Sequence, residues 1–99
     1  MANLMHLFSN PTEIASGIGQ NVLKLRLAKN LSRKTLAQRS GVSESSIKRF
    51  ETSGTISLSS LILLAIALDE ITPVAQLFQS VPPRTIEELN NRHRQRGTR

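Results

Sequence analysis

The sequence contains no cysteine, tryptophan or tyrosine, and its two histidines are His6 and His93. Without cysteine, neither a disulfide framework nor a cysteine-ligated metal site can form. The histidines stand near opposite ends of the chain without a cluster of other ligands beside them, which argues against a metal site. No nucleophile, general base and orienting group occur together. We therefore predict a protein that is not an enzyme and that holds neither a metal ion nor another cofactor.

Long apolar runs are also missing. The longest, residues 61–68, is far shorter than the roughly 20 residues that cross a bilayer. Residues 1–9 contain an apolar patch, but they have no basic start and no long apolar stretch, so they are neither a typical signal peptide nor an anchor. We therefore predict a cytoplasmic protein that has no membrane partner.

Acidic side chains are few: seven Asp and Glu stand against 13 Lys and Arg, which gives a net charge of +6. Residues 24–49 contain eight basic side chains and one acidic one, whereas residues 50–80 contain three acidic side chains and no basic one. Residues 81–99 are basic again. This distribution suits a polyanion that approaches one face of the protein. A solvated basic surface without a partner explains the charge alone equally well.

Apolar periodicity and helix-capping residues predict an all-α fold, a compact five-helix domain without strands. The expected N-caps are Asn10, Ser32, Ser43 and Ser57. The expected helices cover residues 11–29, 33–40, 44–52, 58–68 and 72–78. We predict an N-terminal extension over residues 1–10, a globular domain over 11–80 and a flexible basic tail over 81–99, which begins at a proline pair.

The same patterns predict which side chains are buried. In the first helix, Ile18, Val22 and Leu25, joined by Leu27 or Ala28, are expected to face the core, whereas Arg26 is expected to lie outside it. The fourth helix is apolar nearly all round, so we expect it in the middle of the domain. The polar residues 52–55 are expected to form a loop.

The most informative stretch is residues 31–51. Ala37 is small enough for the second and third helices to cross closely, and Gly41 supplies the positive φ of the turn between them. Val42 and Ile47 fill the angle between these helices. Such an angle lets the outer face of the third helix enter a groove about 12 Å wide. That face carries Glu44, Ser45, Ser46, Lys48, Arg49 and Thr52.

This pattern resembles the helix-turn-helix family of the lambda-type repressors and Cro proteins, also called the xenobiotic-response-element type. The residues that match are Leu36, Ala37, Gly41, Val42, Ser43, Ile47, Phe50, Glu51 and Gly54, followed by Leu58, Leu61, Ile62, Leu77 and Phe78. The resemblance covers about residues 18–78. It implies a five-helix fold and makes residues 11–80 a helix-turn-helix domain that binds double-stranded DNA. Binding to DNA would associate the protein with the bacterial nucleoid.

The resemblance also implies roles for single residues. Glu44, Ser45 and Arg49 match positions that read base edges, since arginine pairs with guanine and glutamate accepts from cytosine. Glu44 is equally well explained as a favourable residue at a helix start. Arg33 stands where the family often has a glutamine that grips the DNA backbone. The expected phosphate contacts are Arg33, Ser43, Ser46, Lys48, Thr52, Ser53 and Thr55. Glu51 is expected to form a contact within the protein instead.

One recognition helix buries too little surface for tight specific binding, so we expect a homodimer on an inverted repeat. The candidates for its interface are Ile71, Val74, Leu77 and Phe78, joined by Leu4, Leu7 and Phe8. Some of these side chains must instead complete the core of the monomer, and the sequence does not divide them.

The main functional prediction is a sequence-specific transcriptional repressor. A first alternative is an antitoxin that binds a kinase-like toxin protein and represses its own operon, because residues 85–89, followed by arginines, resemble the C-termini of such regulators. A second alternative is a scaffold that has lost DNA binding. It predicts no salt-dependent affinity for any duplex.

Overall fold

The computed structural model describes residues 10–80, and within them it contains five helices and no strand. The helices are α2 (Pro11–Ala28), α3 (Arg33–Ser40), α4 (Glu44–Ser53), α5 (Leu58–Ala67) and α6 (Ile71–Ala75). The predicted all-α fold with five helices is confirmed. Most of the predicted extension and all of the predicted basic tail lie outside the described residues.

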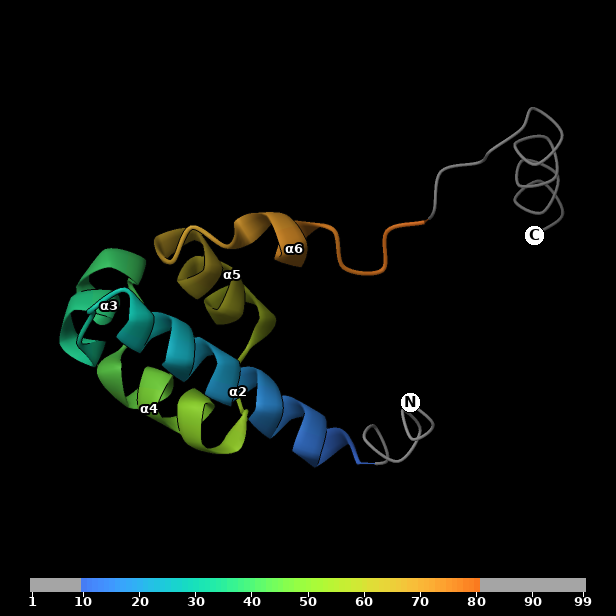
Figure 1. Cartoon of the computed structure of the whole chain (residues 1–99), viewed down its shortest axis with the longest axis horizontal. Helices are drawn as coiled ribbons and strands as arrows, with labels where there is room; N and C mark the ends of the chain where they lie inside the picture. The colour runs from blue at the N-terminus through green and yellow to red at the C-terminus, as the bar shows by residue number, and fades with distance from the viewer. Residues whose placement is uncertain (1–9, 81–99) are drawn as a thin grey trace, which may run out of the picture.

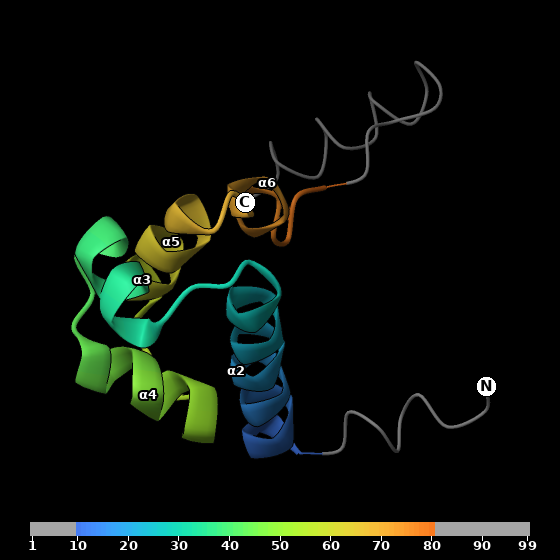
Figure 2. The same ribbon diagram turned by 60° about the vertical axis from the view of Figure 1, so that its left-hand side comes forward.

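The helices pack one on another in a series that begins with α2, the longest helix. Helix α2 packs along α4, α3 packs on both α4 and α5, and α6 packs on α5 (Figures 1 and 2). The helix-turn-helix pair, α3 and α4, therefore lies between α2 and α5. This arrangement leaves one long side of α4 without a neighbouring helix (Figure 2).

Polar caps fix where four of the helices begin. The side chain of Asn10 accepts a hydrogen bond from the backbone N–H of Thr12 at 2.8 Å. Ser32, Ser43 and Ser57 each accept from the N–H three residues further on, at 3.0–3.1 Å. Each bond satisfies one of the free N–H groups of a first helical turn. All four predicted caps are confirmed.

Residues with a left-handed backbone conformation follow α2, α3 and α4 and end these helices. Asn30 has a φ of 57° just after α2, and Gly41 and Gly54 have φ values of 82° and 81° after α3 and α4. The N–H of Gly41 closes α3 on the carbonyl of Ala37. These conformations favour asparagine and glycine, so the predicted stops at Asn30 and Gly41 are confirmed.

Apolar side chains from α3, α4 and α5 form the centre of the core. The six that are buried in one cluster are Leu36, Val42, Ile47, Phe50, Leu64 and Leu68. Val22 and Leu25 of α2 pack against this cluster while remaining partly exposed. The angle between α3 and α4 is therefore filled from both sides, as expected for Val42 and Ile47.

Helices α2 and α4 approach each other so closely that Gly19 has no room for a side chain. A Cβ atom at Gly19 would lie 2.1 Å from the carbonyl oxygen of Phe50. Just after the last turn of α4, a Cβ atom at Gly54 would lie 2.3 Å from the backbone of Ala15. The two glycines thus permit close contact between α2 and the C-terminal part of α4.

Two expected boundaries were wrong. Helix α4 continues through Ser53, so Thr52 and Ser53 belong to its last turn and not to a loop. Helix α6 ends at Ala75, and residues 76–78 form a turn closed by bonds from Leu77 to Val74 and from Gln79 to Gln76. The positive φ of Phe78, 60°, is incompatible with a further helical turn.

Two expectations about burial were also wrong. Helix α5 does not lie in the middle of the domain, because only one of its sides joins the core and Leu58, Leu63 and Ile66 are exposed. Arg26 is buried rather than outside, because it pairs with Glu51 of α4.

Candidate nucleic-acid interface

Helix α4 has one buried side and one polar, exposed side. Ile47, Phe50 and Glu51 are buried and fix its inner side against the rest of the domain. At 3.6 residues per turn, the other positions fall on a single arc that faces away from the core. The exposed residues of α4 are Glu44, Ser45, Ser46, Lys48, Arg49, Thr52 and Ser53. All three predicted base-reading residues are thus on one surface, together with Lys48 and Thr52.

The turn before α4 sets the direction in which this helix leaves α3. Gly41 takes the left-handed conformation, and the hydroxyl of the buried Ser40 accepts a hydrogen bond from the N–H of Val42 at 3.1 Å. Val42 is itself buried. The role of Ser40 was missed by sequence reasoning, because a serine at a helix end gives no distinct signal.

Ser43 uses its hydroxyl within the cap of α4. It accepts from the N–H of Ser46 at 3.1 Å and donates to the hydroxyl of Ser46 at 2.8 Å. A shallow hollow beside this helix start is lined by Lys34, Ala37, Gln38, Gly41, Val42, Ser43 and Glu44. The start of α4 carries the positive end of its helix dipole, and Lys34 adds a cation to the same hollow.

Ser46, Arg49 and Thr55 lie together at the side of α4 that faces the start of α5. They line a second hollow, of about 230 Å³, with Ile56, Ser57 and Ser60. The predicted contacts Ser46 and Thr55 therefore lie beside Arg49, although Ser46 is at the edge of the exposed arc. This hollow extends the polar surface from α4 onto the N-terminus of α5.

The last turn of α4 places Thr52 and Ser53 at its exposed end. Their hydroxyls donate to the carbonyl oxygens of Lys48 and Arg49, one turn earlier. The hydroxyl of Ser53 also lies 3.2 Å from that of Thr55. Contact with a phosphate through these hydroxyl protons requires the side chains to give up the bonds to the helix.

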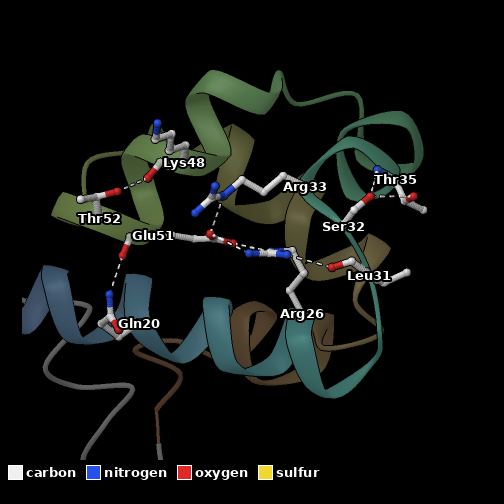
Figure 3. A network of polar contacts seen from close by, with 9 residues as sticks. All are labelled: Gln20, Arg26, Leu31, Ser32, Arg33, Thr35, Lys48, Glu51 and Thr52. Carbon is white, nitrogen blue, oxygen red and sulfur yellow. Dashed lines mark hydrogen bonds and ion pairs between the residues drawn. The ribbon is translucent and has the colours of Figure 1, made fainter.

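Beneath the exposed surface, one carboxylate joins α2, α3 and α4 (Figure 3). Glu51 is 1% exposed, and its two oxygens accept hydrogen bonds from the Nε atoms of Arg26 at 2.7 Å and Arg33 at 2.9 Å. Arg26 donates further from its terminal nitrogens to Glu51, at 3.1 Å, and to the carbonyl of Leu31, at 2.8 Å. The expectation that Glu51 makes a contact within the protein is confirmed.

The Glu51 network keeps its carboxylate charged. Burial by itself raises the pKa of Glu51, but the hydrogen bonds and positive charges of Arg26 and Arg33 outweigh it and lower this pKa below the ordinary value. Within residues 10–80, every buried side-chain nitrogen and oxygen has a hydrogen-bond partner. The network is therefore satisfied, which is the condition under which a buried ion pair is tolerated.

Arg33 binds the buried Glu51 and also reaches the solvent. The sequence did not predict the contact with Glu51. The Nε of Arg33 is bound to Glu51, while its side chain remains 37% exposed at the start of α3. Within the described part of the chain, no hydrogen bond engages its two terminal nitrogens. Arg33 is thus anchored from below, and its outer edge is presented to the solvent.

Two further residues of α2 hold α4 in place and were not singled out from the sequence. The side-chain amide of Gln20 donates to the carbonyl of Glu51 at 2.8 Å, and Gly19 permits the close approach described above. Arg26 is the third such residue. Because all three act on partners about 25–31 positions away, a local sequence pattern carries little sign of them.

The arrangement of α3, α4 and their supporting helices is that of a helix-turn-helix domain. A family model described as helix-turn-helix matches residues 22–75, which is more than half of the chain. The chain therefore belongs to the lambda repressor/Cro-like helix-turn-helix family and is a DNA-binding transcription regulator. Neither a curated protein nor a solved structure matches it.

Neither a metal cluster nor a membrane-spanning helix occurs among residues 10–80. Among residues 10–80, there is no group of three or more His, Cys, Asp or Glu side chains that could hold a metal ion. No single described helix is long and apolar enough to cross a membrane. Only α4 and α5 taken together reach that length and composition, and they are bent by 101° at their junction.

Proposed function

We propose that this regulator is a sequence-specific repressor that binds an inverted-repeat operator as a homodimer and inserts α4 into the major groove. The observation that carries the proposal is the polar arc of α4, which faces the solvent while Ile47, Phe50 and Glu51 hold the helix from behind. An α-helix fits the major groove, where each base pair presents a distinct set of donors and acceptors.

In this proposal, Arg49 donates to guanine, and Glu44 and Ser45 contact bases nearer the start of α4. All three are exposed on α4. Glu44 accepts from a cytosine amino group in this assignment, because a carboxylate is repelled by phosphates. Its alternative role as a helix-start residue remains open.

Phosphate contacts supply most of the affinity in the proposed complex. Lys48 is the strongest candidate on α4 because it is charged and exposed. Arg33 presents its free edge at the start of α3, and its bond to Glu51 limits the side-chain freedom that a phosphate contact has to restrict. The remaining proposed contacts are Ser43, Ser46, Thr52, Ser53 and Thr55.

Dimerisation is proposed through the end of the domain opposite to the start of α2. Ile71 and Val74 are half-buried, whereas Leu77 and Phe78 are exposed. Phe78 is held outside by its left-handed backbone. A symmetric pair would place two copies of α4 in successive major grooves, about 34–36 Å apart.

The antitoxin function remains the alternative. It rests on residues 85–99, which lie outside the described part of the chain. A stable complex with the product of a neighbouring gene would favour this alternative, and it is compatible with DNA binding by the same domain.

Binding to DNA from the chain's own promoter region tests the main proposal. The full chain is titrated into labelled promoter duplex and into a scrambled duplex of equal length, at several salt concentrations. We expect a preference for the promoter on the order of a thousandfold or more, with a two-fold symmetric footprint. Equally weak, strongly salt-dependent binding to both duplexes contradicts a sequence-specific repressor.

A further inference from the structure

An apolar groove of about 430 Å³ lies between α2, α5 and α6, on the side of the domain away from the helix-turn-helix. Among its lining residues only Asn21 and Glu70 are polar. The apolar side chains that line it include Ile18, Val22, Leu25, Leu61, Val74 and Leu77. A groove of this composition favours an apolar occupant without charge.

The apolar stripe of α2 continues beyond the part that α5 and α6 cover. Ile18 lines the groove and is 45% exposed, and Ile14 is exposed one turn closer to the N-terminus. Residues four apart lie on the same side of a helix, so Ile14 extends the stripe. The N-terminal half of α2 lies beside α4 but extends away from α5 and α6 (Figure 2). The uncovered part of the stripe is therefore at the end of α2 to which residues 1–9 are attached.

Residues 1–9 have the composition that this surface requires. They contain Leu4, Met5, Leu7 and Phe8, and they contain no Lys, Arg, Asp or Glu. Nine extended residues reach about 30 Å, whereas Leu25 lies only about 22 Å along α2 from Asn10. The segment is thus long enough to turn at Asn10 and run back along the whole stripe.

We propose that residues 1–9 fold back along α2 and fill the groove of their own chain. Side chains four apart in an extended segment point to the same side about 13 Å apart, and Ile14 and Val22 lie about 12 Å apart along α2. Phe8 therefore covers Ile14 while Leu4 reaches Val22 between α5 and α6. The segment then completes the core on the side where α5 and α6 leave it open. Val74 and Leu77 line the groove, whereas Ile71 and Phe78 do not. The docked segment therefore covers two of the four proposed dimer contacts and leaves Ile71 and Phe78 for the partner.

The absence of cysteine allows a direct test in the full chain. An Asn3→Cys variant carries a single spin label, which broadens the amide signals of nearby residues. In one sample, the spin label and the isotope enrichment are on the same chain. In a second sample, spin-labelled chains without isotope are mixed with isotope-enriched wild-type chains. We expect broadening at Ile18, Val22 and Leu77 in the first sample and its loss in the second.

A pair of matched variants tests whether the groove is the docking surface. Ile18→Ser changes an exposed lining residue, and Leu27→Ser changes an α2 leucine that is 56% exposed and does not line the groove. We expect Ile18→Ser to weaken the broadening at Val22 and Leu77, and Leu27→Ser to leave it unchanged.

Three results overturn the proposal. Broadening in neither sample means that the segment does not dock. Broadening in the mixed sample means that a second copy supplies the occupant. Equal broadening in the two serine variants means that the segment docks elsewhere. Because the measurement uses no DNA, these results are independent of the proposed repressor function.

Discussion

At the residue scale, Glu51 joins three helices through a single carboxylate. It accepts from Arg26 of α2 and Arg33 of α3 while its own helix, α4, carries the exposed polar arc. Arg26 and Glu51 are almost fully buried, so the removal of one partner leaves the other as an unpaired buried charge. Such a loss is costly even where the intact pair contributes little net stability.

Glu51→Gln is therefore expected to lower the free energy of unfolding by about 3–5 kcal/mol. The amide keeps the shape of the side chain but leaves the positive charge of Arg26 without its partner. Urea unfolding of the two proteins measures the difference. Glu44→Gln is the matched control, because Glu44 is exposed, and it should change stability by less than about 0.5 kcal/mol. Equal effects of the two substitutions contradict the network.

The lowered pKa of Glu51 predicts how this stability depends on pH. The carboxyl binds its proton less readily in the folded chain than in the unfolded chain, where its pKa is about 4.3. Its contribution is present above that value and is lost as the pH falls through the lower, folded pKa. The stability gap between wild type and Glu51→Gln should thus shrink in urea unfolding below about pH 4. A gap that is the same from pH 7 to pH 3 contradicts this origin.

Arg26 shows the limit of residue-level reasoning from the sequence. A charged side chain in an amphipathic helix is placed outside by default, and its partner stands 25 positions further on. The expected internal contact of Glu51 was correct, but the sequence did not identify its partners. Arg33 was expected to grip DNA, and its bond to Glu51 appeared only with the structure.

At the element scale, helix starts were predictable because their signals are local. A capping side chain binds an N–H two or three residues away, and a glycine or asparagine adopts a positive φ by itself. The exposed face of α5 was not predictable, because its sequence is apolar on every side and only the packing of α3 and α6 decides which side is covered. The end of α6 was likewise set by the turn at Phe78.

Two glycines of α2 test the contact between α2 and α4. Gly19→Ala is expected to destabilise the fold by about 1–3 kcal/mol, because its Cβ would lie 2.1 Å from the carbonyl oxygen of Phe50. Gly17→Ala has nothing within 4 Å of its Cβ and should stabilise α2 by about 0.5–1 kcal/mol. Thermal or urea unfolding compares the two variants. If both substitutions stabilised the fold, α2 and α4 would have to be further apart than the structure places them.

At the scale of the whole molecule, charge and shape act together. The positive charge is concentrated between residues 24 and 49, which form the last turn of α2, all of α3 and the first half of α4. The family could be recognised from the sequence because the turn, caps and core residues of the helix-turn-helix are close together along the chain. The apolar groove could not be recognised from the sequence, because α2, α5 and α6 meet there only after folding.

Lys48→Ala tests the electrostatic part of the DNA contact. The loss of one phosphate contact should reduce the slope of log affinity against log salt by about one unit, and it should weaken binding to all sequences alike. Titrations of promoter DNA at several salt concentrations give this slope. Lys29→Ala removes an exposed lysine at the end of α2 and should leave the slope unchanged. Identical slopes for all three proteins exclude Lys48 as a phosphate contact.

Arg49→Ala tests directly whether the exposed arc of α4 reads bases. Binding is measured against the promoter duplex and a set of its single-base-pair variants, with Arg39→Ala, another exposed arginine, as the control. We predict a loss of about 1–3 kcal/mol that is confined to one or two base pairs, while Arg39→Ala keeps the full preference. A loss that is equal on every duplex, or no loss, contradicts base reading by Arg49.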